Sequence, residues 1–252
     1  MTSPEEQMSP AQAVRAAAGP VGRLGGAWMM TPEATTRGEE LGLKGWAFYY
    51  LGRGGVLGEV DASVVAATFV FFPPELLRKG WERGQQVLTV AQAHEHYVQL
   101  CLDWGRKKFA SWAGAGRLAD LLTEAAVAAD VSGIPLFAGW RALLTGQVGR
   151  TDDPARCALA LQVLREHRGG LHALAVVAAG IAPLQAVVSG RYGPDNAAMF
   201  GWPQPWPEAE PGRAAMAEVE RVTDRLVEPA FAALRPDDRA ELVDLLRAAA
   251  AL

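Results

Sequence analysis

The strongest constraint on the fold is that apolar residues recur every three or four positions along almost the whole chain. This spacing puts apolar side chains on one face of an α-helix, and the breaks between periodic segments carry helix caps and stops. About ten helices are expected from this pattern, and no segment has the alternation of a convincing strand. Half of the 252 residues are hydrophobic, enough for a substantial core. The sequence therefore predicts an all-α helical bundle.

Several helix starts follow from residues that cap helix N-termini. Thr31 and Asp61 are of this type, and Asp61 opens an apolar helix expected over residues 62–72. Asp152 opens another helix, which we expect to end at Gly169-Gly170 because glycine commonly ends helices.

Segment 85–112 carries two adjacent apolar stripes, which predicts a helix buried over much of its circumference. We expect it to be the central helix joining two lobes, an N-terminal one over 1–112 and a C-terminal one over 113–252. A short sequence repeat, Gly45-Trp46 and Gly139-Trp140, favours two copies of one helical unit. The prediction is a two-lobed, pseudo-symmetric bundle with a cleft between the lobes, in which Phe69, Phe71 and Phe72 face Leu164, Glu166 and His167.

Charge and apolar run length limit the partners. The net charge of −4 argues against nucleic-acid binding by bulk electrostatics. The apolar run Val64 to Phe72 is too short to span a membrane, and the polar start at residues 1–10 lacks the pattern of a secretory signal. We therefore expect a cytoplasmic protein without a membrane partner. Cys101 and Cys157 lie in apolar helical stretches and are predicted to be buried thiols.

The four histidines fall into two close pairs, but neither pair predicts a metal site. His94 and His96 would point about 200° apart on a helix and cannot chelate one ion together. His167 and His172 have no third ligand specified by spacing. No cofactor is implied either, because the glycine-rich segment 52–55 lacks the features of a phosphate-binding loop and is interpreted as a helix stop with Arg53 turned inward.

The segment Glu166–His172 places an acid, two imidazoles and a guanidinium in otherwise apolar surroundings. One interpretation is a cap at the C-terminal end of a helix, in which Arg165, Arg168 and His167 contact the last turn. The other is a site that grips an anionic or aromatic ligand. In the second case we expect a pocket between the lobes, lined by Tyr49, Arg53, Phe69, Phe72, Trp140, Glu166, His167, Arg168 and His172.

Residues 172–190 have the spacing of a helix-turn-helix, with Gly180 at the turn and Pro183 starting the second helix. That second helix offers one Gln and one Ser, whereas base readout normally needs several Arg, Lys, Asn or Gln side chains. Residues 208–252 hold ten acidic and six basic residues, a net −4 where phosphates would approach. DNA is thus a weakly supported partner.

The chain resembles the SalK-like family of actinobacterial proteins over roughly residues 10–235. The resemblance rests on Leu41 through Tyr49, Gly52-Arg53, Leu57 through Val60, Thr68-Phe69 with Phe72-Pro73, Leu164 through His172, Gly180-Ile181, and Glu220 through Leu226 with Pro229. It implies a helix-turn-helix protein whose C-terminal part is similar to MarR-type winged-helix regulators. Some members lie among natural-product biosynthesis genes.

Two departures from the family pattern affect what the resemblance implies. Gly170 and Leu171 stand where the pattern has Asp and Gly, so a carboxylate is missing. The winged-helix portion expected after Gly201 is replaced by a short Pro-rich loop, residues 201–212. The resemblance therefore implies a reduced winged-helix-like C-terminal part that has lost its means of binding DNA.

These observations lead to one leading function and two alternatives. The leading function is a small-molecule-binding protein related to winged-helix regulators, with reduced or lost DNA binding. The first alternative is an enzyme of natural-product biosynthesis in which His167 or His172 is the general acid or base and Glu166 orients an imidazole. The second is a DNA-binding repressor. A homodimer is an expected state, because regulators of this kind are usually dimers.

Overall fold

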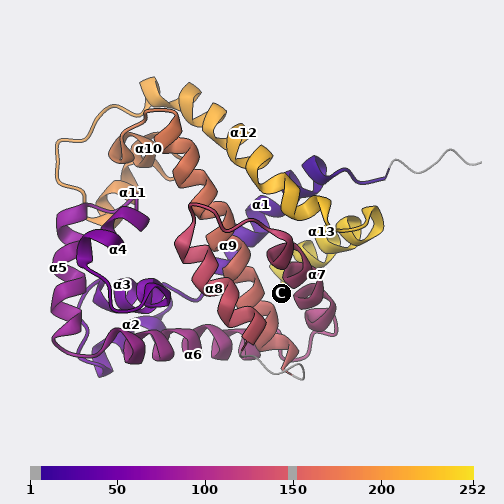
Figure 1. The fold of residues 1–252 in the computed structure, drawn as a ribbon, viewed down its shortest axis with the longest axis horizontal. Coiled ribbons are helices and arrows are strands. Elements are labelled where there is room, and N and C mark those ends of the chain that lie inside the picture. The colour runs from indigo at the N-terminus through magenta and orange to yellow at the C-terminus, as the bar shows by residue number, and fades with distance from the viewer. Residues whose placement is uncertain (1–6, 147–151) are drawn as a thin grey trace, which may run out of the picture.

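The computed structural model of the protein describes residues 7–146 and 152–252. In these two ranges the chain forms thirteen α-helices, one short 3₁₀-helix and no strand, which confirms the predicted all-α bundle (Figure 1). The helices of the first range are α1 (Pro10–Gly26), α2 (Pro32–Glu40), α3 (Ala47–Gly54), η1 (Gly55–Leu57), α4 (Ala62–Thr68), α5 (Pro74–Gln85), α6 (Val90–Lys108), α7 (Ala115–Ala128) and α8 (Pro135–Gly146). Those of the second are α9 (Asp153–Ala178), α10 (Pro183–Ser189), α11 (Gly193–Phe200), α12 (Glu210–Ala232) and α13 (Pro236–Ala251).

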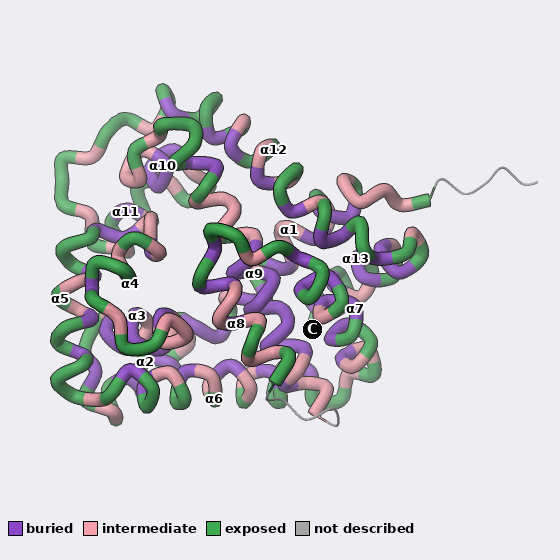
Figure 2. The backbone as a smooth tube through the Cα atoms, viewed as in Figure 1, coloured by how far each residue is buried: buried purple, intermediate pink, exposed green. Residues whose placement is uncertain are grey.

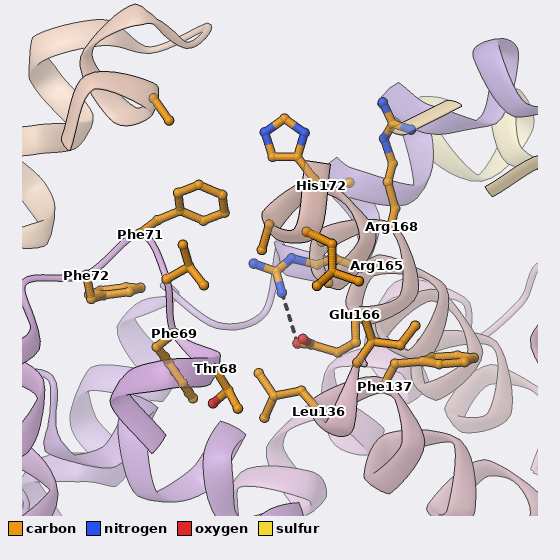
Figure 3. A pocket seen from close by; sticks show the side chains of 18 of the residues that line it. Thr68, Phe69, Phe71, Phe72, Leu136, Phe137, Arg165, Glu166, Arg168 and His172 are labelled. Carbon is orange, nitrogen blue, oxygen red and sulfur yellow. Dashed lines mark hydrogen bonds and ion pairs between the residues drawn. The ribbon is translucent and has the colours of Figure 1, made fainter. Parts of the chain in front are cut away.

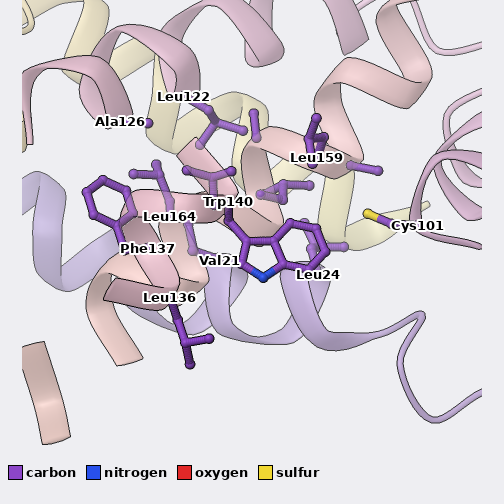
Figure 4. Close-up of a cluster of buried hydrophobic side chains, with 14 of the residues drawn as sticks. Val21, Leu24, Cys101, Leu122, Ala126, Leu136, Phe137, Trp140, Leu159 and Leu164 are labelled. Carbon is purple, nitrogen blue, oxygen red and sulfur yellow. The ribbon is translucent and has the colours of Figure 1, made fainter. Parts of the chain in front are cut away.

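Helix α9 is the central element of the bundle. It contacts α1, α6, α7, α8 and α12 (Figure 1). Most of its buried residues lie between Ala155 and His167, so the first half of the helix is enclosed on all sides (Figure 2). The main core lies where α9 meets α1, α7 and α8, and includes Leu24, Leu122, Trp140 and Leu159 (Figure 4). Burial on all sides explains why this helix has little amphipathic pattern in the sequence.

The prediction that segment 85–112 forms the central helix is wrong. Helix α6 begins after the N-cap Thr89 and runs along one edge of the molecule (Figure 1). It buries a single stripe, Val90, Ala93, Tyr97, Cys101 and Gly105, because it packs on one side only, mainly against α3 and α9. The other predicted apolar stripe, which carries Leu88, Val98 and Leu102, is therefore partly exposed. The division into lobes at residue 112 stays a prediction.

Two predicted helix ends also differ from the structure, although Thr31, Asp61 and Asp152 cap their helices as expected. Helix α4 ends at Thr68 rather than Phe72, since Pro73 and Pro74 lie directly ahead and residues 69–72 form a turn.

The glycine pair Gly169-Gly170 does not end α9, which continues to Ala178. Gly170 faces Ile134, and a Cβ built on Gly170 would lie 2.6 Å from Ile134 Cγ2, so this glycine permits close packing. A Cβ at Gly169 would meet no atom within 4 Å. Gly170 therefore marks a close approach to the segment before α8, and neither glycine marks a helix terminus.

The two neighbouring glycines should therefore respond oppositely to the same substitution. We expect Gly169→Ala to raise the free energy of unfolding by about 1 kcal/mol, because alanine favours the helix and fits the open space. We expect Gly170→Ala to lower it by about 1–3 kcal/mol through overpacking against Ile134. Urea unfolding of the two variants measures both changes, and a gain in stability at position 170 would contradict the packing described here.

Helices α9 and α10 form the predicted helix-turn-helix geometry. The chain bends by 114° between them, and four residues, 179–182, separate the two helices. Gly180 has a φ of +68°, a left-handed conformation that suits glycine. A crossing near 90–120° over a three- or four-residue turn is typical of this motif. As expected, α10 is largely buried, through Ala186 to Ser189.

After α11, residues 201–209 form a loop that leads into α12 and α13, with no strand in this described part of the chain. The predicted Pro-rich loop 201–212 is thus confirmed over residues 201–209, whereas residues 210–212 form the start of α12. Among the described residues no single helix is long and apolar enough to cross a membrane; the bent pair α9 and α10 meets that test only jointly, by length and composition. Cys101 and Cys157 are buried as predicted, and burial raises the pKa of the Cys157 thiol to about 12.

Candidate functional site

A cavity of about 690 Å³ opens between α9 and the segments that surround its second half. One wall is the turn Phe69–Phe72 after α4, and the facing wall is α9 from Arg165 to Val177 (Figure 3). Residues 133–137 before and in α8, the helices α10 and α11, and parts of α1, α3 and α12 complete the lining. A volume of this size suits a small organic molecule.

Seven of the nine predicted pocket residues line this cavity. They are Tyr49, Arg53, Phe69, Phe72, Glu166, Arg168 and His172. Three residues of α9, Leu164, Glu166 and His167, were predicted to face the three phenylalanines. Only Glu166 lines the cavity with them. Leu164 and His167 lie on another side of α9, because neighbouring helical residues point about 100° apart.

Trp140 does not line the cavity, contrary to the prediction. Its side chain is fully buried in the core, where the indole packs against Trp28 with ring centroids 6.4 Å apart. Its Nε1 donates a hydrogen bond to the backbone oxygen of Arg53 over 3.1 Å. Trp140 therefore holds the backbone of α3 at Arg53, the residue whose side chain faces the cavity.

His167 is the second predicted pocket residue that points elsewhere. It lies on the side of α9 that packs near Val14 and Phe231, and its ring centroid is 4.7 Å from that of Phe137. Burial, together with the charge of Arg141, lowers the pKa of His167 from 6.5 to about 4, although Asp130 opposes this shift. The imidazole is therefore neutral at pH 7 and has no access to the cavity.

The buried neutral His167 predicts a loss of stability in mild acid. Between its ordinary pKa of 6.5 and the folded value near 4, the unfolded chain binds a proton that the folded protein does not. The folded state therefore loses stability as the pH falls through this window, by about 2 kcal/mol from pH 6.5 to about pH 5. We expect His167→Leu to remove this part of the loss in urea unfolding at both pH values.

Burial also lowers the pKa values of His94 and His172, so these two histidines add to the loss of stability in mild acid. His96→Leu, at an exposed position, is the matched control for replacing one histidine by leucine. If the free energy of unfolding fell as steeply with pH in His167→Leu as in the wild type, the assignment of this loss to the buried His167 would be contradicted.

The turn after α4 brings three aromatic rings to one wall. Phe69 and Phe72 are joined by a backbone hydrogen bond from Phe72 N to Phe69 O, and their rings lie 6.1 Å apart. Phe71 also faces the cavity, with its ring 5.7 Å from that of His172. Phe71 lay in the predicted cleft but not among the predicted pocket residues. An uninterrupted helix to Phe72 would have spread the three rings around its circumference.

A buried ion pair joins α3 to α9 at the floor of the cavity. Arg53 donates from Nε to Glu166 Oε1 over 2.7 Å and from Nη2 to Glu166 Oε2 over 2.8 Å. Its Nη1 donates to the hydroxyl of Tyr49 over 3.0 Å, and its guanidinium lies 4.5 Å from the Phe69 ring centroid. Arg53 is turned inward, as predicted, at the end of α3.

Glu166 is held by more donors than Arg53 alone supplies. Its Oε1 also accepts from Gln162 Nε2 over 2.7 Å and from Arg165 Nη1 over 3.2 Å, and only 1% of its side chain is exposed. Burial by itself raises the pKa of Glu166, but the charge and hydrogen bonds of Arg53 outweigh it and hold the pKa below its usual range. Glu166 is therefore an ionised carboxylate held in place by four N–H donors.

Arg165 is a cavity residue that the sequence-based pocket omits. Only the cap interpretation includes it, and that interpretation needs the helix to end at the glycines. In the structure its guanidinium reaches from α9 into the space facing the phenylalanine wall (Figure 3). Two glycines of α1 make room for it, since a Cβ at Gly25 would lie 2.9 Å from Arg165 Cβ and one at Gly26 3.1 Å from its Nε. The Gly25-Gly26 pair was the available sequence signal.

Arg168 and His172 connect α9 to α12 at the upper rim. Arg168 donates to Asp224 Oδ1 over 2.7 Å and to Glu220 Oε2 over 2.6 Å, and it points away from the phenylalanine wall (Figure 3). The cap interpretation of these side chains is wrong, because the helix has no end here.

His172 lines the cavity as a neutral imidazole. Its Nδ1 lies 3.1 Å from the Thr223 hydroxyl, which already donates to the Val219 carbonyl and so accepts a hydrogen bond from Nδ1–H. Burial lowers the pKa of His172, with Arg168 acting in the same direction and Glu220 against it. The second ring nitrogen, Nε2, is then an acceptor.

The other histidine pair plays no part in the cavity. His94 is half-buried with Nδ1 2.7 Å from the Gly52 carbonyl oxygen, and His96 is exposed. In the described part of the chain no three His, Cys, Asp or Glu residues lie close enough together to hold a metal ion.

One comparison with known proteins matches the chain. A family model described as a helix-turn-helix family covers residues 14–252, which includes the cavity and the α9–α10 turn. No curated protein and no solved structure matches at a significant level.

Proposed function

The chain belongs to this helix-turn-helix family, and from that premise we propose that it is a regulator-like protein whose cavity binds a small organic molecule. Helix-turn-helix proteins are typical DNA-binding regulators, so DNA is the partner that membership suggests. The finer resemblance, to SalK-like proteins and a MarR-type end, is part of the proposal. Arg53, Phe69 and Glu166, among the residues that carry it, lie at the cavity.

The observation that carries the proposal is the cavity itself. Its lining is mostly apolar and aromatic, with charged groups gathered along α9, a combination common to small-molecule sites. Such a space in a helical core costs stability unless a ligand or water fills it. The cavity also borders the motif, because Ala186 and Val187 of α10 line it.

The second helix of the motif is poorly suited to base readout. Helix α10 has seven residues and buries Ala186 to Ser189, and its sequence contains no Arg or Lys. We propose that in this chain α10 is mainly a wall of the cavity and that DNA binding is reduced or lost.

Fluorescence anisotropy with a labelled duplex of the gene's own upstream sequence tests DNA binding. We expect no saturable binding at about 50 mM or 200 mM salt, because α10 offers no basic side chain to the groove. A scrambled duplex is the control. Tight binding to the upstream duplex that weakens steeply with salt would overturn the loss of DNA binding and favour the repressor alternative.

An enzyme using a histidine general acid or base is less favoured by the geometry. His167 faces away from the cavity, and Glu166 is held by hydrogen bonds from Arg53, Gln162 and Arg165, not by an imidazole. His172 is the remaining candidate in the cavity. The arrangement therefore supports a binding site better than an acid–base pair.

Titration with N-phenyl-1-naphthylamine, a neutral apolar fluorophore, tests ligand binding in the cavity. We expect saturable binding to the wild type with enhanced fluorescence. Gly169→Phe should weaken it at least tenfold, because Gly169 lines the cavity and open space at its Cβ admits a ring there.

Gly146→Phe is the matched control. Gly146 also has open space at its Cβ but lies outside the cavity, so this variant should bind as the wild type does. Absence of saturable binding, or equal binding by the wild type and Gly169→Phe, would overturn the proposal.

A further inference from the structure

We propose that the cavity selects organic anions with a ring-sized apolar body, and that Arg165 recognises their carboxylate. This inference rests on the proposed binding function and names the chemical class of its ligand. It follows from the hydrogen-bond inventory at the cavity floor, from the charges along its walls and from the aromatic lining.

The floor of the cavity has unused donors, whereas most of the acceptor capacity of its one carboxylate is already used. Glu166 Oε1 accepts from three donors and Oε2 from Arg53, so the carboxylate has little capacity for a ligand donor. Arg53 uses three of its five N–H groups on Glu166 and Tyr49. Arg165 makes one hydrogen bond through its guanidinium within the described part of the chain, which leaves four N–H donors.

Arg165 is placed to use those donors on a ligand. Its side chain is 28% exposed, compared with 13% for Arg53, and the exposed part lies in the cavity facing the phenylalanine wall (Figure 3). The guanidinium is planar and carries paired N–H groups, which match the two oxygens of a carboxylate. Its stem packs beside Gly25 and Gly26 of α1, so its position is constrained.

The charges around the cavity favour an anion. Four arginines and two glutamates line it, and the lining imidazole of His172 is neutral. Arg53 and Arg165 share the single carboxylate of Glu166, and Arg168 is paired with Glu220 and Asp224. One positive charge at the floor therefore has no carboxylate of its own, in a partly desolvated site where such a charge attracts an anion strongly.

The aromatic and aliphatic lining residues determine which kind of ligand body fits the cavity. Phe69, Phe71 and Phe72 form one wall, and Phe137 lies across the cavity from them (Figure 3). Ile134 and Leu136 also line the cavity. Aromatic rings pack well against such surfaces. A carboxylate attached directly to a ring system would place the anion at Arg165 and the rings between these walls.

The test compares two probes of nearly equal shape, 2-naphthoate and its neutral amide, 2-naphthamide. Each displaces N-phenyl-1-naphthylamine from the protein at neutral pH. We expect 2-naphthoate to bind roughly tenfold or more tightly than the amide, because hydrogen bonds to a charged group are stronger than neutral ones.

In Arg165→Met, which keeps an apolar stem of similar length, we expect this preference to disappear while the affinity for the amide is retained. Arg165→Lys should keep part of the preference, since it keeps the charge without the planar fork. Arg247→Met, at an exposed position of α13, is the matched control and should behave as the wild type.

The possible outcomes separate this inference from the proposed function. Equal binding of the two probes by the wild type, or an unchanged preference in Arg165→Met, overturns the inference. If the fluorophore still binds in that case, the proposed function of the cavity as a binding site stands. Failure of the fluorophore and of both probes to bind overturns the proposed function itself. A preference that is lost only in Arg165→Met supports the inference.

Discussion

Replacing Arg53 by methionine is expected to lower the free energy of unfolding by about 3–5 kcal/mol, because it leaves the buried carboxylate of Glu166 without its main partner. Glu166 is 1% exposed, so water cannot replace the two hydrogen bonds from Arg53. Gln162 and Arg165 still contact Oε1, but the bond to Oε2 is lost entirely. Urea unfolding at neutral pH measures the loss.

The double variant Arg53→Met with Glu166→Leu is the matched control. It removes both charges and fills the same space with apolar groups, which is often neutral or stabilising for buried pairs. We expect it to recover most of the stability that Arg53→Met loses. A single variant within about 1 kcal/mol of the wild type, the value typical of exposed pairs, would contradict the buried ion pair.

Trp140→Ala is the second substitution with a large expected effect. Removing this fully buried indole should cost about 3–5 kcal/mol in the free energy of unfolding, through lost burial and the cavity left behind. The hydrogen bond to the Arg53 carbonyl is lost as well. Thermal and urea unfolding measure this cost.

Trp140→Phe distinguishes a supporting role from a ligand contact. It keeps a buried ring and loses the indole N–H, so we expect a smaller cost of about 1–2 kcal/mol and unchanged affinity for N-phenyl-1-naphthylamine. A folded Trp140→Phe protein that binds the fluorophore much more weakly would place Trp140 at the ligand after all.

The fold class and much of the cavity could be predicted from the sequence because both depend on local patterns. Caps at Thr31, Asp61 and Asp152 depend on a side chain and a backbone N–H two or three residues away, and all three were identified correctly. The charged segment Glu166–His172 was recognisable because charge in apolar surroundings needs partners. Its partner Arg53, 113 positions away, was included in the predicted pocket.

The errors arose where packing between distant segments decides the local structure. Gly169-Gly170 has the composition of a helix end, yet Ile134 packs against Gly170 and the helix continues. Once α9 is continuous, the direction of each side chain is fixed by the helical turn. His167 is then directed to the opposite side, and Arg165 enters the cavity.

The choice of central helix failed for a related reason. Segment 85–112 has two apolar stripes, but only one packs against other helices, whereas the first half of α9 is buried on all sides and shows weak periodicity. Burial around a whole helix erases the amphipathic signal on which sequence analysis depends.

The measurement that tests the central claim most directly is photo-crosslinking with a diazirine-bearing benzoate, followed by peptide mapping. Irradiation generates a carbene that inserts into the residues around the bound probe. We predict saturable labelling within residues 67–72, 133–137 and 165–177, the segments that face one another across the cavity, and its suppression by excess N-phenyl-1-naphthylamine. Labelling scattered over the surface, or labelling that the competitor does not reduce, would contradict a ligand site in this cavity.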